Sequence, residues 1–212
     1  MHYRLGKPSD AKRLAQIHTK IKEVNSLGIF VLMGGNFLKT YYNIVLEDPW
    51  SYCLCAVDEN DNVVGYSFNL IDSERHHKFL YSHKVCLAFS AVGTICRKPG
   101  LVKEIYRRYK SLKSNDGTYA APSGARGGYW GWDPDFKESE SALELRERMS
   151  LITDALGIKT LNFEVDIDNS KVYKFHKWAG AIEDEIVVLP DGRKRALMHY
   201  DQQKRRQLFK LS

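Results

Sequence analysis

Residues 132–181 read WDPDFKESESALELRERMSLITDALGIKTLNFEVDIDNSKVYKFHKWAGA, and this stretch decides the fold. From Ala142 to Leu156 apolar residues recur every three or four positions, which predicts an amphipathic helix. Gly157 then stands where a C-cap glycine belongs. Apolar and polar residues alternate over Leu161–Ile167, which is typical of a strand with two different faces. A short helix over Asn169–Trp178 completes a predicted order of helix, strand and helix.

The same two patterns extend outward from this stretch. Strands are predicted at Tyr3–Leu5, Tyr52–Val57, Val63–Ile71, Gly127–Asp133, Ile186–Leu189 and Ala196–Tyr200, and helices at about 8–24, 37–46 and 75–116. This order of elements predicts a mixed α/β (α+β) fold. The length fits a single domain, 1–212, in which residues 74–117 are predicted to form a helical insertion.

The composition excludes several classes of protein. Of the 212 residues 43% are hydrophobic and 27% are charged, which excludes wholesale disorder. The longest apolar run, Val85–Cys96, is too short for a membrane span and predicts a buried helix. The chain begins MHYRLGKPSDA, without an apolar signal-peptide stretch, so a cytoplasmic location is expected. The four cysteines include no second pair for a zinc site, so no metal is predicted.

The formal net charge of +6 favours an anionic partner. Much of the positive charge lies at 97–113, where seven lysines and arginines stand with a lone Glu104. This segment predicts contact with an acidic or phosphorylated acceptor, and a solvated surface is the alternative. It matches no nucleic-acid-binding motif, so no nucleic acid is expected as a partner.

The order of motifs in this chain resembles that of the GNAT superfamily of acyl-CoA-dependent N-acyltransferases. Members commonly show V-x-P-x-[YF]-[RQ]-x-x-G-x-[GA], then a helix, a glycine, an L-x-L-x-V strand and N-x(6)-Y-x(3)-G-F. The corresponding residues here are Trp132–Ala142, Gly157, Leu161–Val165, Asn169 and Gly180-Ala181. The spacings agree from Pro134 to Gly180 without a gap.

The resemblance implies a fold, a cofactor and an activity. The fold is a mixed, mostly antiparallel central sheet flanked by helices. The activity is N-acetyl transfer from acetyl-CoA to the amine of a small-molecule acceptor, by direct attack of the amine on the thioester. The cofactor-binding residues that it implies are Trp132, Asp133, Lys137, Glu138, Ser139, Glu140, Ser141, Ala142 and Asn169.

The turn that would hold the cofactor diphosphate departs from the family pattern. Glu140 replaces the loop glycine, Lys137 replaces Arg or Gln, and Glu138 adds a second carboxylate. Two carboxylates at a helix N-terminus repel a further anion there, although the hydroxyls of Ser139 and Ser141 are able to donate hydrogen bonds. The alternative function is therefore a non-catalytic GNAT-like binding module whose CoA diphosphate turn has decayed.

Catalytic candidates follow from the same comparison. His176 stands where many members have the tyrosine that protonates the leaving thiolate, and an imidazolium suits this role because its ordinary pKa of about 6.5 lies near neutral pH. Tyr173 lies one helical turn earlier on the same face, so either residue is a candidate general acid. As general base the candidates are Asp133, Glu164 and Asp166.

The aromatic strand Gly127–Asp133 has two interpretations. Trp130 and Trp132 share one face at period two, so they line an acceptor pocket or pack in the core. In the family the backbone of this strand pairs with the pantetheine arm. The backbone N–H groups of Tyr129–Asp133 would then polarise the thioester carbonyl.

Overall fold

The computed structural model describes residues 1–22, 29–113, 123–189 and 192–209. Its centre is a seven-stranded sheet of order β1-β2-β3-β4-β5-β7-β6. The strands are β1 (His2–Leu5), β2 (Ser51–Val57), β3 (Val63–Leu70), β4 (Arg126–Trp132), β5 (Thr160–Asp166), β6 (Ile182–Val188) and β7 (Lys194–Asp201). Every neighbouring pair is antiparallel except β4 and β5, which are parallel. The predicted mixed, mostly antiparallel sheet is thus confirmed.

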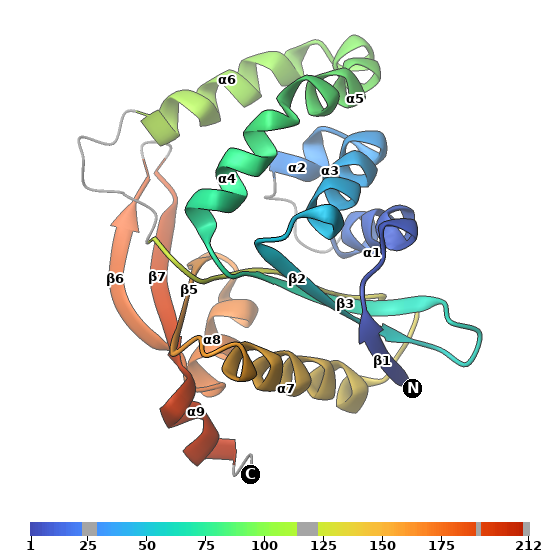
Figure 1. Ribbon diagram of the computed structural model, residues 1–212. Helices are drawn as coiled ribbons and strands as arrows, with labels where there is room; N and C mark the ends of the chain where they lie inside the picture. Colours follow the sequence, from blue (N-terminus) through green and yellow to red (C-terminus); the bar gives the residue numbers. More distant parts are fainter. Residues whose placement is uncertain (23–28, 114–122, 190–191, 210–212) are drawn as a thin grey trace.

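Helices cover both faces of this sheet (Figure 1). One face carries η1 (Pro8–Asp10), α1 (Ala11–Lys22), α2 (Ile29–Leu32), α3 (Gly35–Glu47), α4 (Ser73–Ser82), α5 (Lys84–Arg97) and α6 (Gly100–Lys113). The opposite face carries α7 (Ser139–Ala155) and α8 (Ser170–Trp178), and α9 (Gln202–Phe209) follows the last strand. Neither α2 nor α9 is predicted by the sequence patterns, and β6 begins four residues earlier than its alternating pattern.

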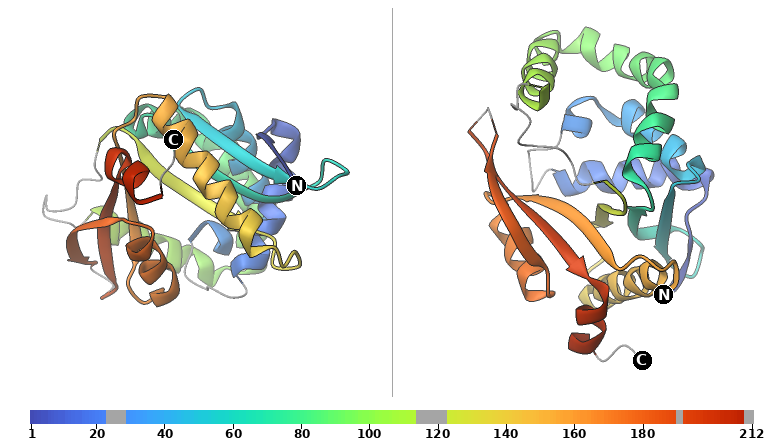
Figure 2. Two further views of the ribbon diagram at one scale, coloured as in Figure 1. Left: turned by 90° about the horizontal axis from the view of Figure 1, so that it is seen from below. Right: turned by 60° about the vertical axis from the view of Figure 1, so that its left-hand side comes forward.

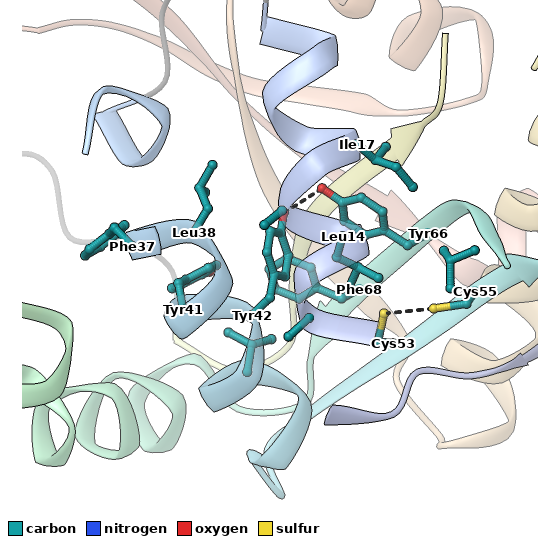
Figure 3. Close-up of a cluster of buried hydrophobic side chains, with 14 of the residues drawn as sticks. Leu14, Ile17, Phe37, Leu38, Tyr41, Tyr42, Cys53, Cys55, Tyr66 and Phe68 are labelled. Carbon is teal, nitrogen blue, oxygen red and sulfur yellow. Dashed lines mark hydrogen bonds between the residues drawn. The ribbon is translucent and has the colours of Figure 1, made fainter. Parts of the chain in front are cut away.

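The larger core lies between α1, α3 and strands β2 and β3 (Figure 3). Leu14 and Ile17 of α1 and Leu38 of α3 are fully buried there, as their helical spacing requires. The hydroxyls of Tyr42 and Tyr66 meet inside this core at 2.5 Å. Each buried hydroxyl therefore has a hydrogen-bond partner, which removes the cost of burying it.

Two smaller cores lie on the opposite face. In one, Leu145 and Met149 of α7 pack on Leu54 and Val64 of the sheet. In the other, the apolar side chains of β5 and β7 pack against α8. The alternation over Leu161–Val165 therefore has its expected effect, because one face of β5 is buried against a helix.

The predicted insertion contains α4, α5 and α6, although the last residues of the predicted helical stretch lie outside the described part. The expectation of a buried helix at Val85–Cys96 is wrong. In α5 only Ala91 is buried and Phe89 is 75% exposed, because this helix lies in the outermost layer with one edge on α3. Two buried side chains, His76 of α4 and Asp48 at the end of α3, are hydrogen-bonded to each other and fasten α4 to the core.

Length and apolar composition decide which of the described helices would suit a membrane span. In the described part of the chain, no single helix has the length and apolar composition of a membrane span. Helices α4 and α5 satisfy those two criteria only when taken together, and they meet at an angle of 67°.

Candidate active site

A wedge opens between the parallel strands β4 and β5. Their ladder contains the pair Arg126 and Asn162, near the start of both strands, and beyond it the two strands separate. A bulge in β4 accompanies the separation, because Ser67 and Asn69 of β3 pair with Trp130 and Gly127, leaving one extra residue in β4. Peptide groups of β4 beyond the bulge therefore face the wedge without a ladder partner in β5. A ligand with amide groups is able to pair with them as an added strand does.

Helix α8 packs against β5 (Figure 2). Phe175 stacks on Trp130 of β4 with ring centroids 6.0 Å apart and planes within 6°. The next residue, His176, lies 4.5 Å from the ring of Phe163 on β5. Adjacent residues of α8 thus reach both strands, which places His176 below the wedge.

His176 is the end of a hydrogen-bonded chain that begins at Arg146. The guanidinium of Arg146 on α7 donates to the hydroxyl of Tyr200 on β7 at 2.8 Å. Since an arginine has no acceptor, the Tyr200 oxygen must accept this bond, and its own proton is free to be donated to Nδ1 of His176 at 2.7 Å. With Nδ1 accepting this bond, the ring proton of the neutral imidazole is assigned to Nε2.

The charge of His176 differs from the expectation. Burial lowers its pKa to about 3, and the nearby guanidiniums of Arg146 and Arg205 act in the same direction. At neutral pH the side chain is therefore a neutral imidazole and not the imidazolium that the sequence suggested. What it offers is one N–H donor at Nε2.

Tyr173 points away from the wedge. Its hydroxyl donates to Glu183 on β6, which is the far edge strand of the sheet. The hydrogen bond to this carboxylate raises the pKa of Tyr173, and burial adds to the effect. Although Tyr173 and His176 belong to one helix, the structure directs them to different strands.

The acidic candidates on β5 face the side of the sheet that carries α1. Glu164 contacts Arg126 of β4 and, at 2.9 Å, Arg195 of β7, while Asp166 contacts Arg195 at 2.8 Å and Arg193 at 3.1 Å. Burial raises the pKa of Glu164 above its ordinary value, and Arg195 opposes the effect. This polar cluster lies at the rim of the wedge, on the face opposite to α8.

Asp133 is buried beneath α1 at the end of β4. Arg13 approaches its Oδ2 to 2.6 Å and Lys20 approaches its Oδ1 to 3.0 Å. Burial alone would raise the pKa of Asp133, but the backbone N–H of Asp135 together with Lys20 and Arg13 lowers it. Because its pKa is lowered, Asp133 is a weak base, and its two ion pairs anchor α1 to β4.

The turn before α7 is the least suited part of the site for an anion. Glu138 is the N-cap residue of α7, and its carboxylate accepts the Ser141 hydroxyl at 3.0 Å. The proton of this hydroxyl is therefore donated to Glu138 and is not available to a bound anion. Lys137, Ser139 and Glu140 are exposed, so a diphosphate would meet one lysine and two carboxylates. The residues present fit the amide-bearing arm of acetyl-CoA better than they fit its diphosphate.

The remaining predicted cofactor residues have different surroundings. Trp132 is partly buried in the core under α7, and its Nε1 donates to the Phe136 carbonyl at 2.7 Å, so it does not line an acceptor pocket. Ala142 is buried in the first turn of α7. Asn169 is the N-cap residue of α8, and its side chain does not cap that helix. In the described part of the chain no group of three His, Cys, Asp or Glu residues could hold a metal.

Arg146, Phe175 and Tyr200 were not predicted as site residues from the sequence. Each lies within a predicted helix or strand, where an apolar or amphipathic residue needs no further explanation. Tyr200 alone gave a signal, because it is a hydroxyl-bearing residue at an inward position of an alternating strand. Such a hydroxyl requires a buried partner.

No protein-family model matches the chain, and no curated protein sequence matches it. Several solved structures do match the chain. Spermidine/spermine N-acetyltransferase SpeG from Vibrio cholerae matches with a TM-score of 0.56 at 13% identity, over the whole of this chain and 96% of that one. A Desulfovibrio desulfuricans protein assigned to the GNAT family gives 0.58 at 10% identity, over 95% and 98%. Chaetomium thermophilum Naa20 in complex with a bisubstrate analogue gives 0.53 at 16% identity, over 98% and 90%.

These matches establish the fold. Nearly the whole chain superposes on GNAT-family acetyltransferases, so the resemblance read from the motif order is confirmed at the level of the fold. A structural likeness at this level of sequence identity shows the fold, and the activity, the acyl donor and the acceptor need separate evidence.

Proposed function

We propose that this protein is an N-acetyltransferase that acetylates the amine of a small molecule, with acetyl-CoA as the acyl donor. The observation that carries the proposal is the wedge between β4 and β5, with unpaired β4 peptide groups on one side and the Nε2–H of His176 beneath it. When bound, acetyl-CoA supplies the activated acetyl thioester. A cytoplasmic location, small-molecule acceptor and single domain with an insertion at 74–117 remain predictions.

In this proposal β4 and the α8 face of the sheet bind the acyl donor and protonate the leaving group, and the α1 face receives the acceptor. The β4 backbone from Tyr129 to Trp132 orients the amide-bearing arm and donates an N–H to the thioester carbonyl. His176 donates its Nε2 proton toward the leaving sulfur, while Nδ1 takes the hydroxyl proton of Tyr200. Arg146 stabilises the charge that develops on the Tyr200 oxygen.

The acceptor amine approaches from the face that carries α1. There Glu164 is the general base of the proposal, because burial raises its pKa in spite of its arginine partners, whereas the pKa of Asp133 is lowered. Tyr173 and Asp133 are assigned supporting roles, since each is held by partners away from the wedge. Nothing in the structure supports an acidic or phosphorylated acceptor at 97–113. In that segment Arg107 pairs with Glu104, and the side chains of 108–113 lie outside the described part.

One observation favours the non-catalytic binding module as the second candidate. Glu138 and Glu140 stand at the start of α7. The hydroxyl of Ser141, which could donate to a diphosphate, donates to Glu138 instead. If this turn fails to hold a diphosphate, the wedge serves another ligand and the fold is a binding scaffold.

The test is calorimetric titration with acetyl-CoA, followed by release of free thiol in the presence of a panel of polyamines, amino sugars and amino acids. The proposal expects saturable acetyl-CoA binding and thiol release with at least one amine class. Tyr200→Phe should bind acetyl-CoA within about twofold of the native protein but turn over at least tenfold more slowly. Absence of acetyl-CoA binding at millimolar concentration would leave the binding module as the function.

A further inference from the structure

A groove of about 670 Å³ lies between α1 and the beginning of α3, and none of its lining residues belongs to β4, β5 or α8. Its lining residues are Lys12, Arg13, Ala15, Gln16, Thr19 and Lys20 of α1 and Gly35, Asn36 and Lys39 of α3. The set contains four cations and no carboxylate. Volumes of this order accommodate a ligand the size of a nucleotide or a sugar phosphate.

The four cations are of two kinds. Arg13 and Lys20 are held at the groove wall by ion pairs with Asp133 at 2.6 and 3.0 Å, and Lys20 also reaches Asp135 at 2.5 Å. Their charge is therefore largely compensated. Lys12 and Lys39 are exposed and form no ion pair with a described carboxylate, so they supply two uncompensated positive charges from opposite walls.

The groove also has an open floor at Gly35. The preceding glycine, Gly34, is explained by the fold, because its φ is +92° and an added Cβ would lie 2.3 Å from Thr94 Oγ1. Gly35 has neither reason, since its φ is ordinary and a Cβ added there would meet nothing within 4 Å. The missing side chain leaves the groove open down to the backbone, which permits close approach of a ligand.

We propose that this groove binds a phosphate-bearing small molecule other than the acyl donor, with Lys12 and Lys39 as its charged contacts. The amide side chains of Gln16 and Asn36 also line the groove and are able to donate to phosphate oxygens. The proposal does not rest on the acetyltransferase activity, because the lining residues are outside the wedge. Two lysines across a groove hold a phosphate as point charges, so the affinity should fall steeply with salt.

The probe is inorganic pyrophosphate, titrated into the full chain by calorimetry at low and moderate salt. Saturable binding is expected, and the double variant Lys12→Glu/Lys39→Glu should weaken it at least tenfold. The matched control is Lys159→Glu/Lys204→Glu, which makes the same charge change at two exposed lysines outside the groove and should stay within twofold. Equal loss in both double variants, or retained binding in the first, would overturn the site.

Gly35→Glu tests the open floor without endangering the fold. A glutamate in the first turn of α3 has a better helix propensity than glycine and a favourable interaction with the helix dipole, so the melting temperature should stay or rise. Pyrophosphate binding should nevertheless weaken at least tenfold. Unchanged binding in this variant would contradict the placement of the ligand.

A final titration separates the two sources of phosphate. With free CoA as the titrant, Lys12→Glu/Lys39→Glu should bind within twofold of the native protein. If CoA affinity falls as much as pyrophosphate affinity, the groove holds the donor's phosphates and a separate ligand is ruled out. If the native chain binds pyrophosphate but not CoA, the phosphate site in the groove is supported while the acetyltransferase proposal fails.

Discussion

Burial makes His176 a neutral donor, and this has a measurable consequence for stability. Its pKa is about 3 in the folded chain and about 6.5 when unfolded, so below pH 6.5 the unfolded state binds the extra proton. The contribution of this residue to the free energy of unfolding is therefore fully present above pH 6.5. It is lost as the pH falls toward 3, by at most about 1.4 kcal/mol per pH unit.

His176→Gln removes this dependence. The native protein should be more stable than the variant at pH 7, because the variant loses the Tyr200 bond, and the difference should shrink between pH 6.5 and pH 4. Urea unfolding of both proteins at several pH values measures it, and the other titrating groups cancel in the difference. A gap that stays constant with pH would show that the imidazole is not buried as described.

At the scale of elements, the charge in the first turn of α7 has opposite effects on helix stability and on diphosphate binding. Glu140 lies in that turn and stabilises the helix through its dipole, by about 0.3–1 kcal/mol. The same charge opposes a diphosphate, at a cost of about 1 kcal/mol for a contact of roughly 4 Å in water. Helix stability and anion binding therefore make opposite demands on this residue.

Glu140→Gln should lower the free energy of unfolding by about 0.3–1 kcal/mol and tighten CoA binding about fivefold at low salt. The control is Glu147→Gln, an exposed glutamate two turns further along α7 that should leave CoA affinity unchanged. Urea unfolding and calorimetry give the two quantities. Unchanged CoA affinity in Glu140→Gln would mean that the diphosphate does not bind at this turn.

At the scale of the whole molecule, a buried histidine–aspartate pair joins α4 to the core. His76 of α4 and Asp48 after α3 are both nearly inaccessible to solvent. Removing one partner leaves the other buried without its partner, which typically costs about 3–5 kcal/mol. The insertion and the core should therefore unfold together.

His76→Ala should lower the stability of the whole chain by about 3–5 kcal/mol and keep a single unfolding transition. The comparison is His83→Ala at the junction of α4 and α5, where the imidazole bonds to its own helix and the loss should be about 1 kcal/mol or less. Far-UV circular dichroism and tryptophan fluorescence should report the same midpoint. Two separated transitions in the native protein would make 74–117 an independent unit.

Sequence alone determined the elements and their order. Periodicity, turn residues and the spacing from Pro134 to Gly180 are local properties, and they were sufficient for the sheet strands, for α7 and α8, and for the GNAT fold. The same local logic failed for α5, because an apolar run does not record which layer of the molecule covers it.

Tertiary structure alone decided the chemistry of the site. The charge of His176 depends on its burial and on Arg146 and Arg205. Its hydrogen bond depends on Tyr200. These residues are distant in sequence and meet only when β7 and α7 pack beside α8. The anchoring of Asp133 likewise needs α1, more than a hundred residues away. A pKa or a hydrogen-bonded chain reflects the whole surroundings of a group, whereas a sequence pattern carries only its neighbours along the chain.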